Sequence, residues 1–91
     1  MEHKGITLVQ TCGACPEQYD AIRDGVTVGY FRLRHGYFRV DAYLPETETV
    51  YDAHPKGDGL FEKNERDYYL KKGLKKLHKA LKKKAKEAAQ K

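Results

Sequence analysis

Residues 26–44 read VTVGYFRLRHGYFRVDAYL, and this stretch decides the fold. Apolar and polar residues alternate on both sides of His35-Gly36, a pattern typical of two half-buried strands joined by a two-residue turn. A turn of this length fixes which residues face each other across the hairpin. The predicted pairs are Arg34 with Tyr37, Leu33 with Phe38, Arg32 with Arg39, and Phe31 with Val40.

This register divides the side chains between two faces of a sheet. One face is apolar and should pack in the core: Phe31, Leu33, Phe38, Val40 and Leu44. The other face carries three tyrosines and three arginines, and we refer to it as the Arg/Tyr face: Tyr30, Arg32, Arg34, Tyr37, Arg39 and Tyr43.

The Arg/Tyr face has two interpretations. Arg32 lies opposite Arg39, which is unfavourable unless a negative group relieves the repulsion. Asp41 and Glu17 could do so within the chain, and the face would then be an ordinary solvated surface. A phosphate or a partner's carboxylate could also do so, and Tyr and Arg are enriched at the energetic centres of protein interfaces.

Three further segments read as strands: ITLVQT (6–11), QYDAIR (18–23) and TVYDAH (49–54). Asp24-Gly25 is a strong two-residue turn signal, and the polar stretch PETE (45–48) supplies another turn. The sequence therefore predicts an antiparallel β-meander of four to five strands within residues 1–59.

From Leu60 onward the apolar period becomes helical. Leu70, Leu74, Leu77 and Leu81 form the stripe of an amphipathic helix over residues 60–83, with Asn64 as its N-cap and Gly73 as a point of close packing on the sheet. Residues 84–91 should form a frayed basic tail. The predicted class is α+β, with one domain spanning residues 1–91.

The charge is unevenly distributed along the chain. Residues 71–91 carry ten lysines and one glutamate, while residues 1–70 carry eight basic and twelve acidic residues. The result is a mildly acidic body with a strongly basic end. The lysines are either a solvated helix end or a surface for nucleic acid, which such a charge would attract without reading its sequence.

Cys12 and Cys15 are the only two cysteines and form a Cys-x-x-Cys pair. A meander places this pair, His35 and His54 toward one end of the sheet. Two thiolates and two imidazoles make a tetrahedral structural zinc site. Simple pairing through PETE sets His54 nearer to Arg39, so a looser turn or a bulge would have to bring it toward the end of the sheet where the cysteines lie. Asp58 is the substitute ligand.

Two alternatives remain for the cysteine pair. It could be a redox pair, although reactive Cys-x-x-Cys pairs usually open a helix and this one leads through Pro16 into a strand. It could also be two small, partly buried thiols with no chemical role.

No catalytic constellation stands out in the sequence, so we expect a protein that is not an enzyme. No apolar run approaches the roughly 18 residues of a membrane span, and we see no signal peptide. The cytoplasm is the expected compartment.

At CGACPEQYD (12–20), VGYFRLRHGYFRV (28–40) and TVYDAHPKGDGLFEKNERDYYL (49–70), the chain resembles small proteins from phages and prophages of Gram-positive bacteria. Small phage proteins of this kind include counter-defence factors, and some type II anti-CRISPR proteins are similar in size, one of them containing zinc. The resemblance implies no functional residues.

The leading expectation is a phage accessory protein, monomeric or a small homo-oligomer, that binds and inhibits a host defence protein such as the nuclease of a type II CRISPR system. The alternative is a nucleic-acid-binding module that uses the Arg/Tyr face and the Lys-rich helix.

Overall fold

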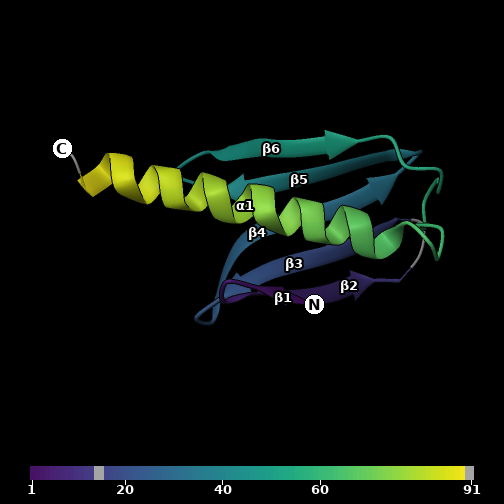
Figure 1. The fold of residues 1–91 in the computed structure, drawn as a ribbon, viewed down its shortest axis with the longest axis horizontal. Helices are drawn as coiled ribbons and strands as arrows, with labels where there is room; N and C mark the ends of the chain where they lie inside the picture. The colour runs from purple at the N-terminus through teal and green to yellow at the C-terminus, as the bar shows by residue number, and fades with distance from the viewer. Residues whose placement is uncertain (14–15, 90–91) are drawn as a thin grey trace.

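The computed structural model describes residues 1–13 and 16–89 of the chain. Six strands and one helix follow one another: β1 (Glu2–His3), β2 (Ile6–Cys12), β3 (Glu17–Arg23), β4 (Val26–Arg34), β5 (Tyr37–Tyr43), β6 (Thr47–Ala53) and α1 (Arg66–Ala89). The strands form one antiparallel sheet in the order β1 to β6 (Figure 1). The predicted α+β class with a meander and a C-terminal helix is confirmed, with six strands rather than four to five.

The central hairpin has the predicted register. Arg34 pairs with Tyr37, and Arg32 lies opposite Arg39. The turn at His35-Gly36 has φ of 53° and 70°, the left-handed conformation that a two-residue turn of type I′ requires. The Asp24-Gly25 turn has the same geometry.

The strand that was not predicted is β1. It pairs with β2, and a third two-residue turn with positive φ, at Lys4-Gly5, joins the two strands. The amide of Gly5 donates a hydrogen bond to the Glu2 carboxylate at 3.0 Å, which closes the turn. Two polar residues give no alternation to detect, so only the turn could have signalled this strand.

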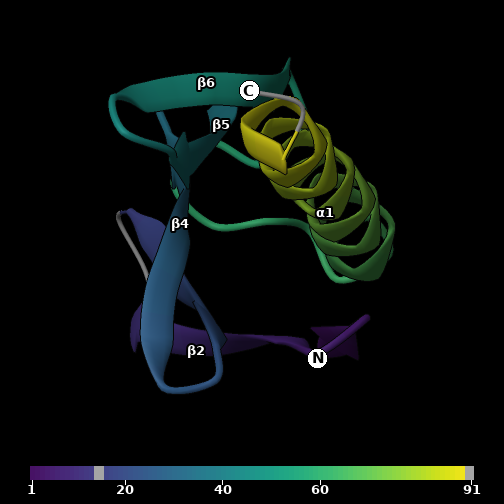
Figure 2. The ribbon, with the colours of Figure 1, turned by 90° about the vertical axis from the view of Figure 1, so that its left-hand side faces the viewer.

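The sheet curls around α1, which lies against its concave face (Figure 2). All four leucines of the predicted helix stripe are buried, together with Phe31, Leu33, Phe38 and Val40 of the hairpin. Gly73 permits close approach, because a Cβ there would lie 2.7 Å from Phe31 and 2.8 Å from Val40. The close packing predicted at this glycine is confirmed.

The start of the helix differs from the prediction. α1 begins at Arg66 rather than near Leu60, and Asn64 is not its N-cap. The carbonyl of Glu62 accepts the Arg66 amide at 3.2 Å, and the Glu65 carboxylate accepts the Glu62 amide at 2.9 Å. The Glu65 carboxylate thus satisfies a backbone amide of the turn that leads into α1, as the acidic half of a capping box does. The helix also continues to Ala89, through the segment expected to fray.

Candidate functional site

Three of the predicted metal ligands lie at the same end of the sheet. Cys12, His35 and His54 stand at or just after the ends of β2, β4 and β6, which point the same way (Figure 1). Cys15, the fourth predicted ligand, lies outside the described residues. The topological part of the prediction therefore fits the fold.

His54 lies closer to the His35 end of the sheet than simple pairing predicted, because the turn before β6 is short and Tyr43 pairs with Thr47. In this position His54 packs on Tyr37, with ring centroids 5.4 Å apart.

A bulge is present, since the register of β5 with β6 shifts between Val40 and Asp41, but it acts in the opposite direction to the one predicted: it leaves Ala53 opposite Phe38 rather than Tyr37. A sequence signal for the bulge existed, because the adjacent apolar residues Val50 and Tyr51 interrupt the alternation of β6 where the register shifts.

The described residues do not bring these side chains into one cluster. Within residues 1–13 and 16–89, no group of three or more His, Cys, Asp or Glu is arranged to hold a metal ion. The backbone carbonyl of Asp58, the substitute ligand, accepts the Gly36 amide at 2.7 Å. The zinc site stays a prediction that depends on Cys15.

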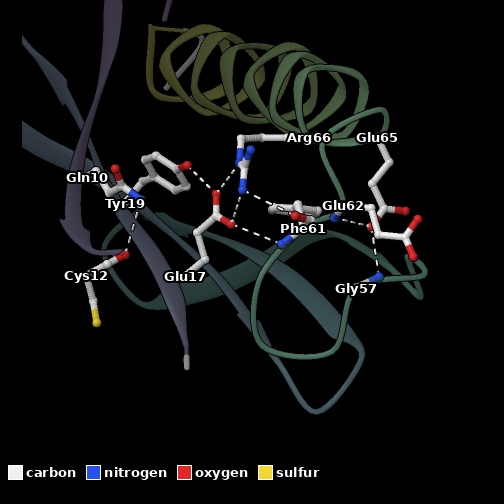
Figure 3. Close-up of polar contacts among 9 residues, drawn as sticks. All are labelled: Gln10, Cys12, Glu17, Tyr19, Gly57, Phe61, Glu62, Glu65 and Arg66. Atoms are coloured by element: carbon white, nitrogen blue, oxygen red, sulfur yellow. Dashed lines mark hydrogen bonds and ion pairs between the residues drawn. The ribbon is translucent and has the colours of Figure 1, made fainter. Parts of the chain in front are cut away.

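The same end of the sheet holds a buried ionic cluster centred on Glu17 (Figure 3). The Glu17 side chain is completely buried. Its Oε2 accepts from Arg66 Nε at 2.9 Å and from the Tyr19 hydroxyl, and its Oε1 accepts from Arg66 Nη2 at 3.1 Å and from the Phe61 amide at 3.0 Å. The expectation that Glu17 neutralises the Arg/Tyr face is therefore wrong: it points inward and pairs with α1.

These contacts determine the charge of the cluster. Burial disfavours the ionised form of Glu17, but the hydrogen bonds from Arg66, Tyr19 and Phe61 outweigh it, so the pKa of Glu17 is lowered. Burial and the adjacent carboxylate raise the pKa of Tyr19. The cluster is an ion pair at neutral pH, with a neutral tyrosine beside it.

A sequence signal for this cluster existed. Glu17, Tyr19 and Ala21 alternate on the buried face of β3, so a strand started one residue earlier would have placed an acid among core residues. A buried carboxylate requires a cation or several donors. Its partner, Arg66, lies 49 residues further along the chain, so only the fold shows which cation pairs with Glu17.

The segment between β6 and α1 closes this end of the sheet. The Gly59 carbonyl accepts the Glu17 amide at 2.8 Å. The Glu65 carboxylate accepts three amides, those of Lys56, Gly57 and Glu62, at 2.8–2.9 Å. Figure 3 shows the contacts with Gly57 and Glu62. Partial burial opposes the charge of Glu65, but the three amides outweigh it and lower its pKa. Protein contacts therefore hold this end together.

The Arg/Tyr face is the convex side of the curled sheet, opposite α1 (Figure 2). Asp41 neutralises Arg39, with Nε and Oδ2 3.1 Å apart, and accepts the Thr49 hydroxyl at 2.8 Å. The expectation for Asp41 is thus confirmed. Within the described chain, neither Arg32 nor Arg34 forms an ion pair with an acid.

Two tyrosines of this face are oriented by hydrogen bonds. The Tyr37 hydroxyl donates to Asp52 at 2.9 Å, and this hydrogen bond raises the pKa of Tyr37. The Tyr30 hydroxyl donates to Gln18. Tyr43 is exposed, although partial burial raises its pKa. The face therefore presents two oriented rings, one exposed ring and two arginines that no acid of the described chain neutralises.

Comparison with protein families, with curated proteins and with solved structures finds nothing that matches this chain. Among the described residues, no helix has both the length and the apolar character that crossing a membrane requires.

Proposed function

We propose that this chain is a non-enzymatic protein that binds another protein through the Arg/Tyr face. The observation that carries the proposal is the state of Arg32: it lies opposite Arg39 and next to Gln18, with no acid paired to it in the described chain. Asp41 offsets the charge of Arg39, so among the described residues the positive charge left without an acid in this pair is that of Arg32. A carboxylate brought by a partner would pair with Arg32.

The surroundings of Arg32 suit such a contact. Tyr30, Tyr37 and Tyr43 supply large rings on the same face, and two of them are oriented by hydrogen bonds to Gln18 and Asp52. Rigid rings beside arginine lose little conformational entropy on binding and are typical of interface centres. The expected partner surface therefore presents acidic side chains around an apolar contact.

The biological role we propose is counter-defence: a phage accessory protein that inhibits a host defence protein in the bacterial cytoplasm. The resemblance of residues 12–70 to small phage proteins supports this role. A nuclease of a type II CRISPR system is the first target to test, because anti-CRISPR proteins of similar size act on such nucleases.

The test is an interference assay in bacteria that carry an active type II effector and a matching phage target. The wild-type chain should restore plaques, and Arg32→Glu/Arg34→Glu should not. Lys75→Glu/Lys82→Glu is the matched control, because it makes the same change of charge at two exposed positions of α1 and should act like the wild type. A pull-down with the same three proteins should give the same ranking. Equal behaviour of all three proteins would refute a role for the Arg/Tyr face.

The structural zinc is a separate part of the proposal, with Cys12, Cys15, His35 and His54 as ligands. Zinc would supply folding energy rather than catalysis in such a closed site. Protein purified without a metal-affinity tag should contain about one zinc per chain, and Cys15→Ser should lose it. Zinc-free protein with two freely reactive thiols would overturn this part without affecting the binding proposal.

A further inference from the structure

A groove runs between β6 and the C-terminal half of α1, two elements that lie side by side in both views (Figures 1 and 2). It encloses about 430 Å³. Leu44, Val50 and Ala80 contribute apolar surface, and α1 contributes four exposed lysines: Lys76, Lys79, Lys83 and Lys84. The sequence predicted a basic helix but not a groove beside it.

The lysines are placed there by the helical repeat. Lys76, Lys79 and Lys83 follow the same three-and-four spacing as the buried leucines, so they form a row on the β6 side of the leucine stripe. No ion pair neutralises any of the four within the described part of the chain. Glu48 and Glu87 also line the groove, which leaves a net positive charge.

The dimensions of the groove favour a single extended polyanion chain over a duplex. From Lys76 to Lys84 the helix rises about 12 Å, at 1.5 Å per residue. A volume of about 430 Å³ lies toward the small end of the range of ligand pockets. The groove therefore has room for a short length of one extended chain, whereas duplex DNA, whose major groove alone is about 12 Å wide, is too broad to enter.

We propose that this groove binds the sugar–phosphate backbone of a single-stranded nucleic acid. A row of three lysines with a fourth beside its end matches a polymer that carries a negative charge on every unit. None of the described residues that line the groove is aromatic, so they offer bases no ring on which to stack, and binding should not depend on base sequence. This inference does not rest on the proposed function, because it uses a different surface.

The experiment is fluorescence anisotropy of the full chain with a labelled 20-nucleotide oligo-dT. Four phosphate contacts predict a salt slope of about −2.8, so raising salt from 50 to 200 mM should weaken binding about 50-fold. Lys79→Gln/Lys83→Gln should halve the slope, and the same salt change should then weaken binding only about 7-fold. A mixed-sequence oligonucleotide should bind as oligo-dT does.

The matched control is Lys75→Gln/Lys82→Gln, which removes two exposed lysines of α1 that lie outside the groove. It should keep the wild-type slope, and circular dichroism should show that both variants fold. Equal slopes for the two variants would overturn the proposal in favour of general charge attraction. Tighter binding of duplex DNA, or displacement of the oligonucleotide by an equal charge of polyglutamate, would overturn it in favour of another polyanion. Absence of binding at 50 mM salt would also overturn it.

Discussion

Replacing Glu17 by Gln tests how the end of the sheet is held. The amide has the shape of the carboxylate but only one oxygen, whereas each carboxylate oxygen accepts two hydrogen bonds. If the remaining side-chain oxygen of the variant still accepts the Phe61 amide, the new NH₂ group takes the place of Oε2 and faces two donors, Arg66 Nε and the Tyr19 hydroxyl. The hydroxyl can rotate to accept, but the guanidinium cannot. Glu17→Gln therefore leaves Arg66 without its charge partner.

The expected loss is about 3 kcal/mol of unfolding free energy. Breaking a buried ion pair by removing one partner costs roughly 3–5 kcal/mol. The low end applies here, because the Arg66 side chain is 31% exposed and water can solvate part of it. In a domain of this size, about 3 kcal/mol corresponds to a fall in Tm of roughly 12–24 °C.

The assay is urea unfolding of the wild type and Glu17→Gln from pH 7 to pH 3. The folded-state pKa of Glu17 is lowered from its usual 4.5, so its stabilisation is present above that pH and is lost as the pH falls through the folded value. The gap between the two proteins should be constant above about pH 5 and should narrow below pH 4.5. Glu46→Gln, an exposed control with the same chemical change, should match the wild type.

Two results would refute this reasoning. One is a gap below about 1 kcal/mol at pH 7, which would mean that water replaces the carboxylate at little cost. The other is a gap that does not change down to pH 3, which would mean that geometry rather than the charge of Glu17 carries the stability.

Three further predictions follow from single contacts. Gly73→Ala should lower the unfolding free energy by up to about 2 kcal/mol in urea unfolding, because overpacking against Phe31 and Val40 costs roughly 1–3 kcal/mol and helix propensity returns only about 1 kcal/mol. A variant more stable than the wild type would show that Phe31 and Val40 move aside without cost. Glu65→Gln should speed amide hydrogen exchange at Lys56 and Gly57, whose shared acceptor it weakens, and unchanged exchange would contradict those bonds. Asp52→Asn should return the pKa of Tyr37 toward its ordinary value in an NMR titration, since the hydrogen bond to Asp52 is the main cause of its shift, and an unmoved pKa would exclude that cause.

The sequence specified the central sheet because its turns are short. A two-residue turn leaves no freedom in register, so His35-Gly36 fixed every pair from Arg34 with Tyr37 to Phe31 with Val40. The leucine stripe likewise fixed the buried side of α1. Local periodicity was sufficient in both cases, because each pattern repeats over several residues.

Contacts between distant segments could not be predicted in this way. Glu17 meets Arg66 only because the segment after β6 crosses the end of the sheet and delivers the start of α1 there. The residue at which α1 begins also depends on this crossing segment. The Glu65 carboxylate accepts the amides of Lys56 and Gly57, which belong to that segment, as well as the amide of Glu62. A capping pattern read along the chain favoured Asn64, because it ignored those partners.

The buried cluster also changes what a metal at this end of the sheet would do. The sequence-based hypothesis was that zinc holds the end of a small sheet together. The hydrogen bonds of Glu17, Gly36 and Glu65 already hold the crossing segment there. Zinc on Cys12, Cys15, His35 and His54 would add stability to an end that protein contacts close, rather than create the closure. The fold therefore does not require the zinc prediction to be correct, and a zinc-free protein would still present the Arg/Tyr face and the lysine groove.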